Sequence, residues 1–329
     1  MIKVERNNTN RSRGLSDKSL PFIAAVKTVL NDLREYWPLT LRQVYYQLVA
    51  SEKIIDPLTK EQLAPIENSI NSYKRLSTML TKARLQRLIP WAAIEDRTRA
   101  TLASGGWMDA HHFINDEQEN FLDGYKRHLT QTQDIALEVW IEKDALSKVA
   151  HRAAVKYCVP VVVAKGFSSI SYMHQCKQRI TSYARQGQPT VILYFGDFDP
   201  SGWEMPEAML ETFHGDMKIP QDHLRIYRCA LNEDQVHDMG LPHSPEAIKP
   251  KDSRARKFVD RFGMVAVELD AIPPADLEAL VGESIEQVLD MDKFEAQQMA
   301  EALDGATISE LRGEVETMIT KWQEAHDID

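Results

Sequence analysis

Short apolar runs alternate with amphipathic stretches along the middle of the chain. The apolar runs occupy residues 136–141, 159–164 and 191–195. Helical patterns follow each run, over residues 145–157, over 170–184 and from Pro200 onward. Apolar runs of this length, rich in β-branched and aromatic residues, are typical of strands buried on both faces. With a closing strand over 224–231, the alternation predicts an α/β unit built on a parallel sheet with right-handed crossovers.

Helical spacing dominates the chain before this unit. Helices are predicted over residues 21–36, 41–51 and 71–88. In the second of them, Thr40 is the expected N-cap, and apolar side chains recur at the spacing of a core-facing helix. These stripe positions are Leu41, Val44, Tyr45, Leu48 and Val49. The N-terminal part is therefore expected to be a mostly helical domain.

Five parts are predicted along the chain. In order they are a flexible arm (1–20), a mostly helical domain (21–102), a linker (103–135), the α/β domain (136–270) and an acidic helical C-terminal region (271–329). The linker is expected to be helical over 114–129, and the α/β domain to include a strand over 264–269 with Glu268 and Asp270 near its end. In the C-terminal region, amphipathic helices are expected over 277–304 and 309–326.

Three carboxylates follow strands of the predicted sheet. Glu142 comes directly after the first strand, and Asp197 and Asp199 follow the third. Because parallel strands end on one edge, these acids are expected to converge there. Carboxylates about 4 Å apart repel by roughly 4 kcal/mol per pair at an effective dielectric of 20, and a divalent cation relieves this. The pattern predicts a site for Mg²⁺ or Mn²⁺. The alternative is that Asp199 caps the next helix while Asp197 is a solvated turn residue.

Tyr46 lies outside the apolar stripe of its helix. It is rotated by about 100° from Tyr45, and Arg42 lies one turn earlier on the same side. A tyrosine beside an arginine and away from the core is a candidate nucleophile. The alternative is a half-exposed aromatic residue with no chemical role.

These residues resemble the motifs of a known family. Glu142 together with Asp197-Phe198-Asp199-Pro200-Ser201-Gly202 resembles a TOPRIM domain, which topoisomerases, primases and some nucleases share. The stretch from Arg42 to Tyr46 resembles the arginine-to-tandem-tyrosine motif of type IIB topoisomerase A subunits and their meiotic double-strand-break relatives. Gln43 departs from the family, which usually has an acid at this position.

The resemblance implies a fold, a reaction and partners. It implies a CAP-like winged-helix domain over 21–102 followed by a TOPRIM domain over 136–270. Tyr46 is then the residue that attacks DNA, Arg42 and Glu142 share the catalytic site, and Glu142, Asp197 and Asp199 hold Mg²⁺. In the family the tyrosine and the metal come from different subunits, which implies a homodimer. Strand passage there also needs a separate ATPase subunit.

Basic residues suggest where double-stranded DNA lies. The predicted helix over 71–88 is a candidate recognition helix, residues 89–99 complete a candidate wing, and a lysine lies near the acidic edge. The candidate phosphate contacts are Lys74, Arg75, Lys82, Arg84, Arg87, Arg97, Arg99 and Lys165. A merely solvated basic face is the alternative. A second basic cluster lies within 245–262.

Composition is that of an ordinary globular protein. The net charge of −10 disfavours nucleic acid overall, but residues 283–329 hold thirteen acids and three bases, so the remainder is about neutral. No apolar run approaches the roughly 18 residues of a membrane helix, and the first twenty residues show no signal-peptide core. The three cysteines have neither metal-site nor disulfide spacing, which predicts a cytoplasmic protein without a membrane partner.

Three alternatives to tyrosine-mediated cleavage stay open. One is a hydrolytic nuclease on the same scaffold, in which water replaces Tyr46 as nucleophile. Another is a DNA-binding protein that does not cleave. The third, a phosphatase or transferase with a D-x-D motif, leaves Glu142 and the basic helix unexplained.

Overall fold

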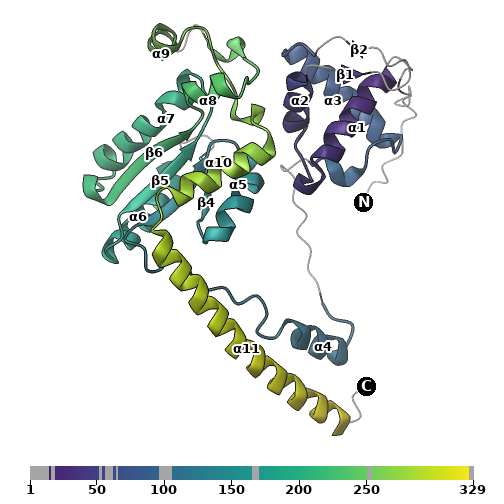
Figure 1. Cartoon of the computed structure of the whole chain (residues 1–329), viewed down its shortest axis with the longest axis vertical. Helices are drawn as coiled ribbons and strands as arrows, with labels where there is room; N and C mark the ends of the chain where they lie inside the picture. The colour runs from purple at the N-terminus through teal and green to yellow at the C-terminus, as the bar shows by residue number, and fades with distance from the viewer. Residues whose placement is uncertain are drawn as a thin grey trace, which may run out of the picture.

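The computed structural model describes residues 15, 19–51, 54–55, 62–63, 66–95, 106–164, 170–249 and 254–325. Within these ranges the chain forms an α/β unit, a helical N-terminal unit beside it, and a long helical arm (Figure 1). The predicted α/β class and parallel sheet are confirmed.

A four-stranded parallel sheet organises the α/β unit. Its strands are β3 (Ala136–Ile141), β4 (Val161–Val163), β5 (Thr190–Phe195) and β6 (Leu224–Ala230), in the spatial order β4-β3-β5-β6. In the register of the central pair, Ala136 lies opposite Thr190 and Ile141 opposite Phe195. The two central strands therefore end level, and the strand order reverses between them, which is where open α/β sheets bind ligands.

Helices cover both faces of this sheet. One core cluster joins alternate residues of β3 and β5, such as Val139 and Leu193, to α5 (Ser147–Ala154) and α10 (Pro274–Glu286). The intervening residues, such as Trp140 and Tyr194, pack with α6 (Ile170–Arg185) and α7 (Pro200–Leu210). Burial on both faces explains why these strands are continuously apolar.

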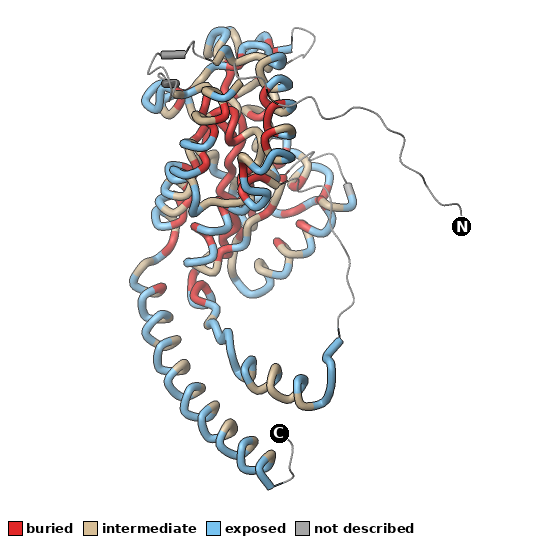
Figure 2. The backbone as a smooth tube through the Cα atoms, turned by 90° about the vertical axis from the view of Figure 1, so that its right-hand side faces the viewer, coloured by how far each residue is buried: buried red, intermediate tan, exposed pale blue. Residues whose placement is uncertain are grey.

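Three helices and a small hairpin form the N-terminal unit. They are α1 (Leu20–Asp32), α2 (Leu41–Ala50), α3 (Ile70–Leu85), and the antiparallel strands β1 (Ile54–Ile55) and β2 (Gln62–Leu63). Thr40 and Gln43 form a capping box at the start of α2, with 3.3 Å from Gln43 N to Thr40 Oγ1 and 2.8 Å from Thr40 N to Gln43 Oε1. Gln43, the departure from the family pattern, thus serves as a helix cap. The largest core cluster continues from this unit into the α/β unit. Figure 2 shows the buried residues gathered in the compact part of the molecule, whereas α11 is mostly exposed.

Short helical turns connect these elements. They are η2 (Arg34–Tyr36), η3 (Trp91–Ala93), η4 (Asp144–Leu146), η5 (Val155–Tyr157), η6 (Glu211–Asp216), η7 (Gln221–His223), η8 (Pro245–Ala247) and η9 (Leu269–Ala271). Two short helices, α8 (Glu233–Asp238) and α9 (Ala255–Phe262), follow β6.

The expected strand over 264–269 is wrong. This segment makes a single antiparallel bridge, between Val267 and Phe198, before η9 begins. It runs beside the loop after β5 and adds no strand to the sheet. The expected wing over 89–99 is also not a hairpin in its described part, because residues 91–93 form η3 and Ile94 makes one bridge to Leu39.

The boundaries of the linker and C-terminal helices also differ from expectation. The linker helix is α4 (Ala110–Asn120), and one continuous helix, α11 (Met291–Ala325), replaces the expected break near residue 305. A glycine inside a helix costs only about 1 kcal/mol, so Gly305 does not end it. The C-terminal helices are instead divided between Glu286 and Met291. There Asp290 Oδ1 accepts a hydrogen bond from Lys293 N at 3.1 Å. Figure 1 shows α11 leaving the α/β unit with α4 beside it. In the described residues, no helix is long and apolar enough to cross a membrane.

Candidate functional site

Asp197 is a buried carboxylate at the carboxyl edge of the sheet. Its Oδ2 lies 2.6 Å from Lys143 Nζ, and its Oδ1 accepts a hydrogen bond from Leu269 N at 2.8 Å. Burial, followed by the nearby charge of Glu142, raises the pKa of Asp197 to about 8 despite Lys143. The pKa of Lys143 is raised, since Asp197, Glu268 and Glu142 together outweigh the effect of its burial.

Glu142 reaches the same loop from the end of β3. Its Oε2 accepts hydrogen bonds from Asp197 N at 3.0 Å and from the Tyr194 hydroxyl at 3.2 Å. A Cβ at Gly202 would lie 2.5 Å from the carbonyl oxygen of Asp197 and 3.1 Å from Glu142 Oε2. The glycine of the D-x-D-x-x-G motif therefore permits a close approach of helix α7 to both acids.

Asp199 faces the start of helix α7. Its Oδ1 accepts hydrogen bonds from Gly202 N at 2.6 Å and from the Ser201 hydroxyl at 2.9 Å. The N-cap role, considered as an alternative from the sequence, is present in the structure. Asp197 is not the solvated turn residue of that alternative, because it is only 4% exposed.

Arg228 on β6 holds the backbone of the acidic loop. Its guanidinium donates to the carbonyl oxygens of Asp197 and Gly202, both at 2.6 Å, and of Leu231 at 3.0 Å. It also lies over the Trp203 ring, 4.9 Å from the centroid. Burial lowers the pKa of Arg228. The sequence pattern did not single out this residue, because β6 looks like an ordinary edge strand.

Two more acids reach the site from η9 and the residue before it. Glu268 forms an ion pair with Arg42 and lies 3.9 Å from Lys143 Nζ. Asp270 is 1% exposed, and neither of its carboxylate oxygens has a hydrogen-bond partner among the described residues. Burial raises the pKa of Asp270 to about 6. The sequence showed both acids near the end of an apolar run, but no pattern indicated that they lie beside Arg42.

Tyr46 lies at the contact between α2 and the α/β unit, and it is buried. Its side chain is 4% exposed, and the Ser244 side chain lies beside its hydroxyl. Burial and then Glu268 raise the pKa of this phenol. The expectation that Tyr46 lies away from the core is wrong, because the segment around Ser244 and η9 covers the side of α2 that the helical pattern left open. Tyr45 is buried in its own unit, as predicted.

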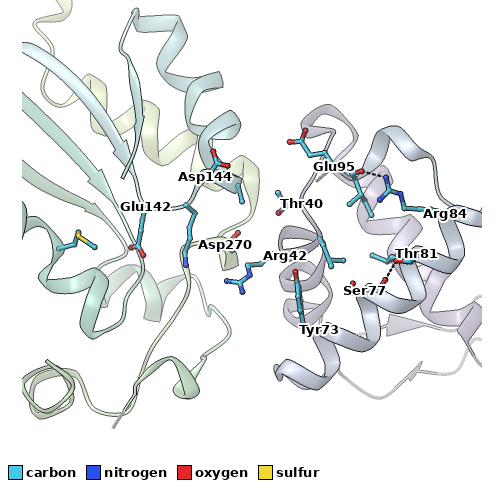
Figure 3. A pocket seen from close by; sticks show the side chains of 16 residues that line it. Thr40, Arg42, Tyr73, Ser77, Thr81, Arg84, Glu95, Glu142, Asp144 and Asp270 are labelled. Carbon is cyan, nitrogen blue, oxygen red and sulfur yellow. Dashed lines mark hydrogen bonds between the residues drawn. The ribbon is translucent and has the colours of Figure 1, made fainter. Parts of the chain in front are cut away.

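A cavity of about 650 Å³ lies between the two units and is lined by residues of both (Figure 3). Arg42, Tyr73 and Thr81 line it from the N-terminal unit, and Glu142 and Asp270 line it from the α/β unit. Lys143 also lines it, whereas Tyr46 does not. The cavity thus exposes cationic and anionic side chains to a ligand without exposing Tyr46.

The donor chemistry of the edge suits a hard divalent cation. Glu142 and Asp197 lie together, Asp199 uses one oxygen for capping, and carboxylate oxygens are the ligands that Mg²⁺ prefers. Among the described residues, however, no three His, Cys, Asp or Glu side chains form a group that could hold a metal ion. Lys143 Nζ already lies 2.6 Å from Asp197 Oδ2, so a cation has to displace its ammonium group.

The candidate DNA contacts are found in different settings. Lys74, Arg75 and Arg87 are exposed and Lys82 is half-buried. Arg84 donates to the carbonyl oxygen of Ile94 at 2.8 Å and lies 4.4 Å from the Trp91 centroid, so it supports its own unit. Three further candidates, Arg97, Arg99 and Lys165, lie outside the described residues.

We compared the chain with protein-family models, curated proteins and solved structures, and none of the three comparisons finds a match. The functional conclusions therefore depend on the chemistry of the residues themselves.

Proposed function

We propose that this protein cleaves DNA strands by transesterification at Tyr46, with Mg²⁺ held by Glu142, Asp197 and Asp199. The observation that carries this proposal is the packing of α2 against the segment before η9. Through it, Arg42 and Tyr46 lie next to Glu268 and the acidic edge of the sheet. Together with the motifs, this arrangement supports a winged-helix and TOPRIM architecture similar to type IIB topoisomerase A subunits.

In the proposed reaction the Tyr46 oxygen attacks a backbone phosphorus. The phenol loses its proton, the new bond joins tyrosine to the 5′ phosphate, and the bond to the 3′ oxygen breaks to leave a 3′ hydroxyl. An ordinary phenol has a pKa near 10, so Arg42 has to favour the phenolate and the charged transition state. Bound Mg²⁺ supplies further positive charge to the phosphate.

Tyr46 has to become accessible before it can react. Its burial keeps it from the cavity, and the Arg42–Glu268 ion pair joins the two units. DNA entering between the units offers Arg42 a phosphate in place of Glu268. The proposal therefore includes a separation of the units on binding double-stranded DNA.

Hydrolysis on the same scaffold is the second candidate function. The cavity is lined by Arg42, Glu142, Lys143 and Asp270 but not by Tyr46. A phosphate in the cavity meets cations and carboxylates directly, and water is then the nucleophile. This geometry favours a nuclease if the units stay together.

Covalent attachment distinguishes the two reactions. Purified protein is incubated with supercoiled plasmid and Mg²⁺ or Mn²⁺, stopped with detergent, and analysed with and without protease. Transesterification predicts DNA that migrates freely only after protease, and loss of this product in Tyr46→Phe. Tyr45→Phe is the matched control, because the partners of its hydroxyl among the described residues are Glu67, Asn68 and Ser69 of the N-terminal unit. Cut DNA that migrates freely in both lanes, and persists in Tyr46→Phe, assigns hydrolysis.

The homodimer and the ATPase partner remain proposals from the resemblance. Within this chain, the tyrosine-bearing helix already contacts an acidic edge, so a first contact between them does not need a second copy. Light scattering of the protein with and without DNA tests the dimer, and ATP-dependent relaxation with added candidate subunits tests the partner.

A further inference from the structure

Helix α9 carries a basic surface that the proposed reaction does not use. The helix and the residue before it contain Arg254, Arg256, Lys257 and Arg261 against one acid, Asp260, in a chain whose net charge is −10. The Arg256 and Lys257 side chains are 93% and 76% exposed. Arg256, Lys257, Asp260 and Arg261 surround one open hollow, so these side chains belong to a single surface.

Aromatic packing fixes this helix to the acidic loop. Phe258 and Phe262, on the inner face of α9, lie 5.2 Å and 5.0 Å from the ring of Phe198. Phe198 is the residue between Asp197 and Asp199, and Trp203 at the start of α7 packs on Phe262 at 4.6 Å. The basic surface is therefore held in a defined position relative to the carboxylates. In Figure 1, α9 lies at the outer end of the α/β unit, beyond α7 and α8.

Arg256 and Lys257 are only weakly paired with neighbouring acids, so their charges are available to a ligand. Lys257 lies 3.7 Å from Glu204, and Arg256 lies 3.9 Å from Asp260, both at the long end of ion-pair distances. Exposed pairs of this kind contribute at most about 1 kcal/mol and yield readily to a stronger anion. The Arg261 guanidinium lies over the rings of Trp203 and Phe262, which orients it without neutralising it.

We infer that α9 is a second contact for the DNA backbone, holding phosphates beside the one that is cleaved. Several exposed cations on one rigid surface can each contact a backbone phosphate, and such contacts position DNA without reading its sequence. This inference rests on the proposed function and adds a contact from the α/β unit to those expected from α3. DNA held by both units lies across the cavity between them.

The test is the salt dependence of DNA binding by the full chain. A fluorescent DNA duplex is titrated by anisotropy over a series of NaCl concentrations, with wild type and the Arg256→Ala/Lys257→Ala double variant. Loss of two phosphate contacts is expected to reduce the slope of log affinity against log salt by about 1.8 and to weaken binding on the order of tenfold. Both side chains are highly exposed, so the fold is expected to be kept, and circular dichroism checks this.

The matched control is Arg185→Ala/Lys218→Ala. These two residues are exposed near the opposite edge of the sheet, at the end of α6 and before β6, so the same charge is removed far from the acidic loop. An unchanged slope in the α9 variant, or equal losses in both variants, overturns the inference while leaving cleavage by Tyr46 intact. A changed oligomer mass with an unchanged slope also overturns it, since α9 then binds a second copy. Wild-type protein that fails to bind DNA overturns the proposed function as well.

Discussion

Two glutamates of one sheet have opposite roles. Glu138 lies in the middle of β3 and is fully buried, whereas Glu142 follows directly after the end of that strand. Glu138 is satisfied by its neighbours, because Arg179 donates to its two oxygens at 2.9 Å and 3.0 Å, and Trp140 Nε1 donates at 2.8 Å. Glu142 has one oxygen bonded to the loop after β5, and its side chain lines the cavity.

The difference shows how position in a parallel sheet decides what a carboxylate does. In the middle of a strand, packing on both faces excludes water, so a charge persists only with a built-in partner. At the carboxyl edge, loops and helix starts leave room for a ligand. The same side chain is therefore structural at position 138 and available for chemistry at position 142. The following predictions test this contrast, in order of decreasing effect.

Removing the partner of the mid-strand acid should have the largest effect on stability. Arg179→Met leaves Glu138 buried with the Trp140 hydrogen bond but without an opposite charge, and we expect a loss of about 3 kcal/mol in the free energy of unfolding. Glu142→Gln, by contrast, should change stability by less than about 1 kcal/mol while abolishing divalent-cation-dependent cleavage. Urea denaturation and the plasmid assay measure the two effects. Similar losses of stability in both variants would falsify the contrast.

Crowding the acidic edge should have an intermediate effect. Gly202→Ala places a Cβ against the Asp197 carbonyl and Glu142, and we expect it to destabilise the protein by about 1–3 kcal/mol. Gly305→Ala is the control, because nothing lies near its Cβ in helix α11, and there alanine should stabilise by about 0.5–1 kcal/mol. Thermal unfolding followed by circular dichroism should show shifts of opposite sign; shifts of the same sign would contradict the close approach at Gly202.

The raised pKa of Asp197 should make stability depend on pH. Its pKa rises from an ordinary 3.8 to about 8, so the folded state holds a proton that the unfolded state releases. The resulting stabilisation is fully present below about pH 4 and is lost as pH rises through 8. In EDTA, the free energy of unfolding of wild type minus that of Asp197→Asn should therefore decline as pH rises from about 4 to about 8, and should level off above pH 8. Asp270→Asn provides the comparison, because the corresponding difference in the free energy of unfolding should stop declining near pH 6. A flat difference for Asp197→Asn would contradict the raised pKa.

An exposed ion pair between the two units should matter least. Lys148 Nζ lies 2.9 Å from Glu95 Oε2, and the lysine side chain is 53% exposed. Because water and salt screen such a pair, Lys148→Ala should cost less than about 1 kcal/mol in denaturant unfolding. A loss comparable to that of Arg179→Met would mean that surface pairing, not the shared core, joins the units.

Much of the α/β unit could be predicted from the sequence, since the apolar runs identified β3, β4, β5 and β6 to within a few residues. The meeting of Glu142 and Asp197 followed from the rule that parallel strands end on one edge. Predictions from local patterns were wrong where contacts with segments distant in the sequence determine the structure. The run over 264–269 has the composition of a strand, yet among the described residues it forms one isolated bridge, between Val267 and Phe198. Tyr46 lies off the stripe of its helix, yet the segment around Ser244 covers it.

The sequence by itself determined the sheet, its helices and the edge on which the acids lie, because strand periodicity and crossover handedness are local properties of the chain. Only the tertiary structure decided the state of the candidate site. It buried Tyr46, paired Arg42 with Glu268, set Lys143 against Asp197 and used Asp199 as a helix cap. These outcomes depend on burial and on charges from segments far apart in the sequence, and no local pattern records them.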